Sequence, residues 1–179
     1  MSAITEPVPT EAPSPAELWL LSASIRPERP TTEIAAGFGA RAPRTVVAPP
    51  AGAAAEVASE LGAAWHVRVI AAEGLADVPP GEPDVAVARR AWEALERVRT
   101  GAEGESLLVV TSYDVLRVLV ARALGAPLER SHALCVDAGR FVLLRQGPLG
   151  LDLRHANVVG PDAEEGAALP GAQAGKARA

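Results

Sequence analysis

The sequence predicts an α/β fold, a three-layer αβα sandwich whose sheet is largely parallel with an antiparallel edge. Short apolar segments alternate with segments of helical periodicity, which is the pattern of a parallel sheet covered by helices on both faces. Nearly half of the 179 residues are apolar, enough for the core of one domain. We expect that domain at 16–159, between a Pro-rich tail (1–15) and an Ala/Gly-rich tail (160–179), both too poor in large apolar residues to pack and therefore predicted to be disordered.

The strands are predicted from short apolar runs. Such runs occupy 18–21, 45–48, 67–70 and 106–110. Two further runs, 134–136 and 141–144, flank the turn-forming residues Asp137–Arg140 and predict an antiparallel hairpin. The only cysteine, Cys135, lies in the first of these two runs and is expected to be a small buried core residue.

The helices are predicted from periodicity and from their start and stop residues. A short helix is expected within 31–41, and a second from Pro49–Pro50 to Leu61 with Gly62 as its stop. The third, 84–99, carries one apolar stripe at helical spacing, formed by Val85, Ala88, Trp92, Leu95 and Val98. The fourth, 115–124, carries charge only at Arg117 and Arg122 and should be well buried, and Gly125 ends it.

Composition excludes several classes of function. The net charge is −5 and the charges are mixed along the chain, so a nucleic-acid surface is not expected. No apolar run approaches the length of a membrane span, and the N-terminus lacks the pattern of a signal peptide, so we expect a cytoplasmic protein without membrane contact. A single cysteine and three scattered histidines show no ligand spacing, and neither a metal nor a cofactor is expected.

The order of elements from Leu18 to Leu144 resembles the histidine phosphatase superfamily, the phosphoglycerate-mutase-like proteins. The clearest similarity is Glu105 to Gly125, which resembles the family's final strand and buried helix. Weaker framework matches are Ala48-Pro49 for a Ser-Pro pair, Leu75-Ala76-Asp77 for Leu-x-Glu, Pro80-Gly81-Glu82 for Pro-Gly-Gly-Glu, and Arg90 for a helix arginine. The resemblance implies the same fold in a truncated form, with a short excursion between Asp77 and Pro80 and a short first helix.

The resemblance also implies a phosphoryl-transfer site, but its reactive residues are missing here. Ser22-Ala23-Ser24 stands in the Arg-His-Gly position, which places Ala23 where the family has its nucleophile. Gly52 lies where a second arginine is expected, Ser112 replaces the second histidine, and Tyr113 replaces the glycine beside it. Without these groups neither attack on phosphorus nor binding of the phosphoryl oxygens is expected. We therefore expect a degenerate member, a pseudoenzyme that is neither phosphatase nor mutase.

The resemblance implies that a pocket remains at the carboxyl ends of the strands, where ligands bind in sheets of this kind, and its polar lining would come from the strand ends and from the matched positions Asp77 and Glu82. The ligand-pocket candidates are Ser22, Ser24, Arg26 and Glu82. The candidates for acid/base chemistry are Asp77, Tyr113 and Ser112, of which Asp77 and Tyr113 would form the pair. Structural roles compete with each: Ser112 as a helix cap, Asp77 and Glu82 as turn residues, and Arg26 as part of a solvated loop.

Three hypotheses about function follow. The first is a domain without catalytic activity that binds a small molecule or a protein partner. The second is a repurposed small-molecule enzyme of specialised metabolism, an acid/base lyase or isomerase such as a cyclase or dehydratase, that uses the polar cluster of the pocket. The third is a structural subunit that pairs with a homologue or with a second copy of itself as a homodimer. Substrate, ligand and pathway are not encoded in any motif that we find.

Overall fold

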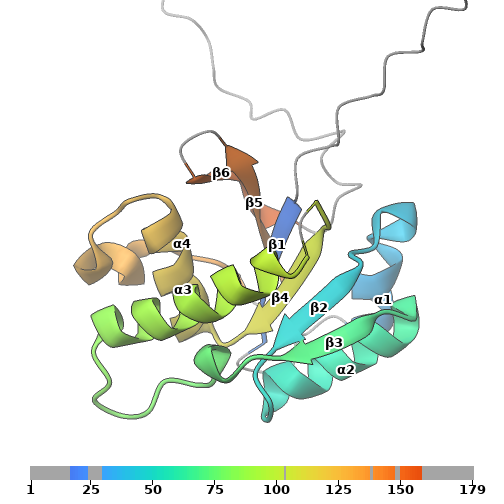
Figure 1. Ribbon diagram of the computed structural model, residues 1–179, viewed down its shortest axis with the longest axis horizontal. Helices are drawn as coiled ribbons and strands as arrows, with labels where there is room; N and C mark the ends of the chain where they lie inside the picture. The colour runs from blue at the N-terminus through green and yellow to red at the C-terminus, as the bar shows by residue number, and fades with distance from the viewer. Residues whose placement is uncertain (1–16, 24–29, 103, 138, 148–149, 159–179) are drawn as a thin grey trace, which may run out of the picture.

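The computed structural model describes residues 17–23, 30–102, 104–137, 139–147 and 150–158 (Figure 1). The two predicted tails, and the pocket candidates Ser24 and Arg26, lie outside these residues. The strands are β1 (Glu17–Ser22), β2 (Thr45–Ala48), β3 (Arg68–Ala71), β4 (Leu107–Thr111), β5 (Phe141–Gly147) and β6 (Gly150–Val158). The α-helices are α1 (Thr31–Ala36), α2 (Ala53–Trp65), α3 (Asp84–Thr100) and α4 (Tyr113–Ala123), and short 3-10 helices lie at η1 (Gly39–Arg41), η2 (Glu73–Leu75) and η3 (Leu128–Ala133).

The strands form one mixed sheet in the order β3-β2-β4-β1-β5-β6. The first four strands of this order are parallel to one another, and β5 and β6 are antiparallel to their neighbours. The predicted sheet, largely parallel with an antiparallel edge, is confirmed. Because β1 and β4 are parallel neighbours in the centre, their carboxyl ends emerge side by side.

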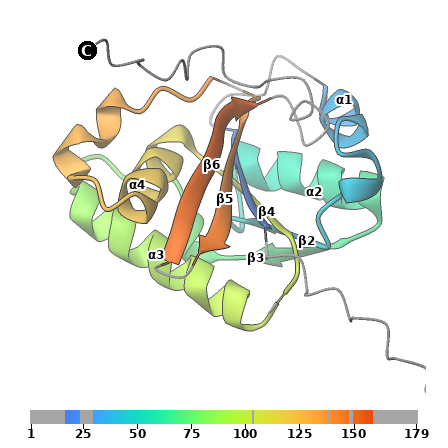
Figure 2. The ribbon, with the colours of Figure 1, turned by 90° about the horizontal axis from the view of Figure 1, so that it is seen from above.

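Helices cover both faces of the sheet, with α1 and α2 on one face and α3 and α4 on the other (Figures 1 and 2). Successive side chains of a strand point to opposite faces, and β1 shows this alternation clearly. Leu18 and Leu20 enter the core beneath α3 and α4, whereas Trp19 enters the core beneath α1 and α2. There Trp19 makes edge-to-face contacts with Phe38 and Phe141. The few aromatic side chains of the chain thus concentrate on one side of the sheet.

The antiparallel edge is built from other residues than the sequence predicts. The hairpin pairs β5 with β6, and 134–136 is not a strand. The segment is held instead by Asn157 of β6, whose side-chain amide donates to the Cys135 carbonyl and whose oxygen accepts from the Asp137 main-chain N–H. Cys135 is exposed, so its expected place in the core was also wrong.

Helix boundaries differ where tertiary contacts decide them. The helix expected at 49–61 begins at Ala53 and continues through Gly62 to Trp65. A Cβ at Gly62 would lie 2.4 Å from Val69 Cγ2, so the glycine serves helix–strand packing and does not end the helix. On α3 the expected stripe is partly wrong, because Val85 is 65% exposed and small residues such as Ala91 face the core.

The helices α1 and α4 also differ from the prediction. The predicted helix 31–41 is divided into α1 and η1, and α4 begins at Tyr113, two residues before the predicted start. No helix in the described part of the chain is long and apolar enough to cross a bilayer.

Candidate functional site

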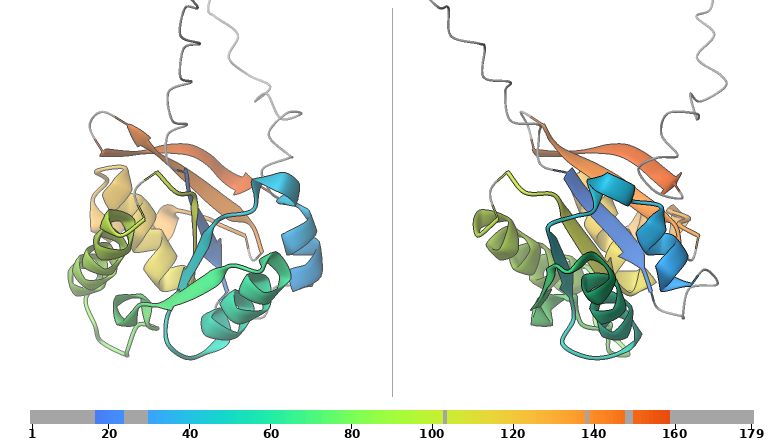
Figure 3. Two further views of the ribbon diagram at one scale, coloured as in Figure 1. Left: turned by 45° about the vertical axis from the view of Figure 1, so that its right-hand side comes forward. Right: turned by 90° about the vertical axis from the view of Figure 1, so that its right-hand side faces the viewer.

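The candidate site lies where β1, β2 and β4 end, because parallel strands bring their carboxyl ends to the same edge of the sheet (Figure 3). Ser22 ends β1 and is 5% exposed, and Ala23 behind it is fully buried. The main-chain N–H of Ala23 donates to the Thr111 carbonyl at the end of β4, at 2.9 Å. This bond continues the pairing of β1 with β4 and brings Ala23 beside Ser112.

Ser112 occupies the N-cap position of α4 and is 6% exposed. A serine there usually accepts a hydrogen bond from the first turn of the helix, but its hydroxyl makes no such cap bond. The Oγ atom is buried and has no hydrogen-bond partner within the described part of the chain. An unpaired buried hydroxyl destabilises a fold by about 1–3 kcal/mol, so Ser112 retains unused hydrogen-bonding capacity beside the positive end of α4.

Tyr113 begins α4 and is half-buried. Its hydroxyl donates to the Leu134 carbonyl, in the segment that follows η3. This contact ties the start of α4 to the connection leading into β5. The structure therefore gives the phenol a structural contact at the edge of the sheet where the sequence places an acid/base group.

Asp77 follows η2 and is exposed at the same edge. Its carboxylate makes no hydrogen bond or ion pair with any described residue. A Cβ added to Gly52 would lie 3.7 Å from Asp77 Oδ2, which places the carboxylate against the N-terminus of α2. Thr111 of β4 holds the segment that leads to Asp77, because its hydroxyl donates to the Leu75 carbonyl at 3.0 Å.

Glu82 is bound by Arg90 of α3. Arg90 Nε and Nη2 each lie 2.9 Å from a Glu82 carboxylate oxygen. The same guanidinium donates to the carbonyls of Gly74 and Ala76, at 2.7 and 2.9 Å. The hydrogen bond from Arg90 holds the pKa of Glu82 below its usual value, although partial burial opposes the shift. Arg90 therefore holds the segment between η2 and α3 in place, and its positive charge is paired with the Glu82 carboxylate.

A second ion pair joins α3, α4 and η3, which no sequence pattern predicts to be in contact. Arg117 of α4 binds Asp84, the first residue of α3, through two hydrogen bonds of 2.7 and 2.8 Å. The buried hydroxyl of Ser131 in η3 donates to Asp84 at 3.1 Å. The hydrogen bond from Arg117 lowers the pKa of Asp84 and raises that of Arg117 itself. Periodicity marks Asp84 only as a helix-start acid, and no local signal identifies Ser131.

The three histidines have separate structural positions. His66 is the left-handed residue that ends α2, at φ 55°, before β3 begins. His132 lies in η3 and His155 in β6. Within the described residues, no group of three or more His, Cys, Asp or Glu side chains is arranged to hold a metal ion. Among the described residues at the carboxyl edge, the Asp77 carboxylate and the Ser112 hydroxyl retain open hydrogen-bonding capacity.

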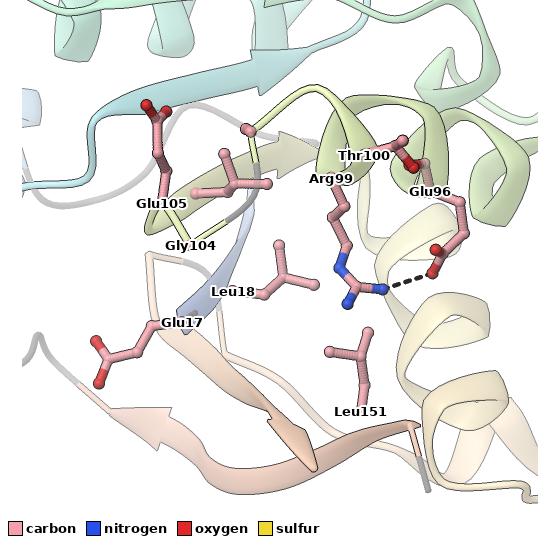
Figure 4. Close-up of a pocket in the computed structure, with 10 residues that line it drawn as sticks. Glu17, Leu18, Glu96, Arg99, Thr100, Gly104, Glu105 and Leu151 are labelled. Atoms are coloured by element: carbon pink, nitrogen blue, oxygen red, sulfur yellow. Dashed lines mark hydrogen bonds and ion pairs between the residues drawn. The ribbon is translucent and has the colours of Figure 1, made fainter. Parts of the chain in front are cut away.

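A cleft of about 290 Å³ lies at the other edge of the sheet, where β1 and β4 begin (Figure 4). Leu18, Leu107 and Leu151 line it together with the end of α3. It does not include Asp77, Ser112 or any other residue of the candidate site. The sequence pointed to no function at this edge, because leucines at strand starts are ordinary core residues.

Comparison with known proteins gives the family. The sequence pattern of the histidine phosphatase superfamily (branch 1) matches residues 38–159, which begin after β1. No curated protein is significantly similar to the chain in sequence.

Three solved structures superpose on most of the chain. YhfR of Bacillus stearothermophilus has a TM-score of 0.70 and 15% identity, over 81% of this chain and 98% of that one. The alpha-ribazole phosphatase of Shigella flexneri has a TM-score of 0.66 and 16% identity, over 80% and 97%. The phosphoserine phosphatase of Entamoeba histolytica has a TM-score of 0.68 and 11% identity, over 79% and 96%. At such identities the superpositions show the shared fold, and with the matched sequence pattern they establish that this chain belongs to the histidine phosphatase superfamily.

Proposed function

We propose that this domain is a member of the superfamily without phosphatase or mutase activity, which binds a small molecule or a protein partner. The observation that carries the proposal is the pair Ala23 and Ser112, adjacent at the ends of β1 and β4. These are the positions where the resemblance places the two reactive histidines. A methyl group cannot attack phosphorus, and a serine hydroxyl needs a base beside it, whereas Ser112 Oγ has no partner.

The charges around the site support the same proposal. Gly52 supplies no guanidinium where a second arginine is expected, and the Asp77 carboxylate lies against it instead. Arg90 is bound to Glu82 and to main-chain carbonyls. A phosphate entering this edge would meet the negative charge of Asp77, and like charges at close range repel.

Turnover and binding of phosphate test the proposal directly. We expect the full chain to hydrolyse p-nitrophenyl phosphate at the buffer rate, and inorganic phosphate to leave its Tm unchanged. The proposal fails if the protein turns the ester over and Ser112→Ala or Asp77→Asn abolishes that turnover. Glu93→Gln, an exposed substitution on the outer face of α3, serves as the matched control.

A second candidate function is acid/base catalysis on a small molecule without phosphoryl transfer. The observation in its favour is the exposed Asp77 carboxylate, which no described residue neutralises. Its expected partner Tyr113 would have to give up its bond to the Leu134 carbonyl before it donated to a substrate. Conversion of a metabolite in a small-molecule extract, reduced roughly 100-fold or more by Asp77→Asn and unaffected by Glu93→Gln, would favour this candidate.

A further inference from the structure

The cleft at the amino edge is distant from the candidate site. It opens where β1 and β4 start, whereas Ala23 and Ser112 follow the ends of the same strands. β1 runs from Glu17 to Ser22, and at about 3.3 Å per residue the two regions are roughly 16 Å apart. A ligand of the size of the cleft therefore cannot bridge them, and the cleft has to be considered as a site of its own.

The floor of the cleft is apolar. Leu18 and Leu107 are each 3% exposed and Leu151 of β6 is 7% exposed, and all three belong to the core beneath α3 and α4. Their side chains come from three strands, so the floor is held by the sheet and is preformed. An aliphatic group placed on this floor would cover the small exposed part of each leucine, so the apolar contribution to binding is modest.

The wall of the cleft presents a donor and an acceptor side by side. Arg99 and Glu96 lie one turn apart on α3, and Arg99 Nη1 is 2.6 Å from Glu96 Oε1. Figure 4 shows the Arg99 side chain reaching down from α3 toward Leu18 and Leu151. A guanidinium carries several N–H donors and a carboxylate several acceptor positions, so a bound group that offers both a donor and an acceptor matches this wall.

The acidic residues at the rim do not add a free charge. The Glu17 and Glu105 carboxylates point away from the cleft in Figure 4. Glu17 Oε1 is bound by Arg145 at 2.7 Å and by Arg41 at 3.4 Å. Glu105 Oε2 lies 3.9 Å from Arg68 and accepts from the Thr45 hydroxyl at 3.4 Å. Because each carboxylate that the structure describes near the cleft has an arginine beside it, the described residues offer neither an anionic nor a cationic ligand an unbalanced opposite charge.

We propose that this cleft binds an uncharged amphipathic small molecule, an aliphatic chain bearing a primary carboxamide or an equivalent donor–acceptor group. The chain lies on the three leucines, the amide oxygen accepts from Arg99, and the amide N–H donates to Glu96. The proposal is independent of the function proposed for the carboxyl edge. The volume of the cleft is at the small end of ligand sites, so a compact ligand and a dissociation constant in roughly the millimolar range are expected for a six-carbon probe.

Three probes of equal length test the ligand class: hexanamide, hexanoate and hexylammonium. Each is titrated into the full chain and followed by chemical shifts of the leucine methyl groups. We expect saturable shifts at Leu18, Leu107 and Leu151 with hexanamide, at least about 10-fold tighter than with either charged probe. The proposal is overturned if hexanamide produces no saturable shifts at these methyl groups, or if a charged probe binds as tightly.

Two variants on the same helix test the wall. Glu96→Ala removes the acceptor and should weaken hexanamide binding about 5- to 10-fold, as expected for one lost hydrogen bond. Glu93→Ala, one turn earlier and exposed outside the cleft, should leave binding unchanged. Equal affinities in the two variants would mean that the ion pair does not recognise the amide, and would overturn the assigned ligand class. Both residues lie at the surface, so folding of the variants is expected and is checked by the unperturbed methyl spectrum.

Discussion

The ion pairs of Arg90 and Arg117 at the carboxyl edge of the sheet differ in kind from the Glu96–Arg99 pair beside the cleft at the amino edge. At the carboxyl edge, Arg90 and Arg117 each join elements that are distant in sequence, through several hydrogen bonds per guanidinium. At the amino edge, the Glu96–Arg99 pair lies within one turn of α3 and borders an open cleft. A contact between separate segments maintains tertiary structure, whereas a contact within one helix turn mainly adds a little helix stability. The Arg90 and Arg117 contacts therefore hold separate segments together, as do the Glu17–Arg145 and Glu105–Arg68 pairs at the amino edge, whereas the Glu96–Arg99 pair beside the cleft does not.

The largest effect is expected from Arg90→Ala. Its loss leaves the Glu82 carboxylate and the carbonyls of Gly74 and Ala76 without their donors. The side chain is only 24% exposed, so we expect the free energy of unfolding to fall by about 2–3 kcal/mol, measured by urea denaturation. The neighbouring Arg89→Ala, at an exposed position, should change it by less than about 0.5 kcal/mol. Equal losses in both variants would mean that the contacts of Arg90 add no more stability than an exposed arginine does, and would contradict the comparison.

The next effect concerns the backbone beside Asp77. Gly52 has φ 90° and ψ −177°, a backbone conformation that is unfavourable for residues with a Cβ atom. Gly52→Ala should destabilise the protein by about 1–3 kcal/mol from backbone strain, because the added Cβ itself makes only an ordinary contact. Gly101→Ala, at φ −83° after α3, is the matched control and should be close to neutral. A neutral Gly52→Ala, measured by thermal unfolding, would show that this turn relaxes.

The third prediction concerns the stability of the protein at low pH. The pKa of Asp84 is lowered in the folded state, chiefly by its hydrogen bond with Arg117. A lowered carboxyl pKa contributes stability that is present above the unfolded value of about 3.9 and is lost as the pH falls through the folded pKa. Asp84→Asn should therefore show a smaller fall in Tm than the parent protein between pH 5 and pH 2. Glu93→Gln should follow the parent curve, and parallel curves for Asp84→Asn would refute the assignment.

The smallest effect is expected at the amino edge. The Glu96 side chain is 43% exposed and its partner is one turn away, so solvent screens the pair. Glu96→Ala should change the free energy of unfolding by no more than about 0.5 kcal/mol, in the same urea experiment as Arg90→Ala. A loss as large as that of Arg90→Ala would mean that the Glu96–Arg99 pair also maintains tertiary structure, and the comparison of the two kinds of ion pair would fail.

The sheet and most of its helices follow from local patterns. The runs at 18–21, 45–48 and 106–110 become buried strands because all their side chains face a core, one on each side of the sheet. The hairpin was misassigned for the same reason. β6 is an edge strand that carries Asp152 and Arg154 between apolar residues, so a search for continuous apolar runs selects 134–136 in its place.

The candidate site was predictable only in part. The ends of strands predict Ser22 and Ser112 at one edge, the family resemblance adds Asp77, and the structure does bring the three segments there. Whether each side chain is engaged depends on residues far along the chain: Tyr113 on Leu134, and Asp84 on Arg117 and Ser131. No periodicity encodes such partners, because they become neighbours only after the elements have packed.

The sequence by itself determined the fold class, the parallel centre of the sheet and the absence of histidine from the ends of β1 and β4, since these depend on residue type and local spacing. The tertiary structure alone decided which strand closes the antiparallel edge, which carboxylates are neutralised and where open volume remains. Those properties depend on long-range packing: Arg90 pairs with the Glu82 carboxylate and contacts Asp77 only at its main-chain carbonyl, and the cleft lies where the end of α3 meets the starts of β1 and β4.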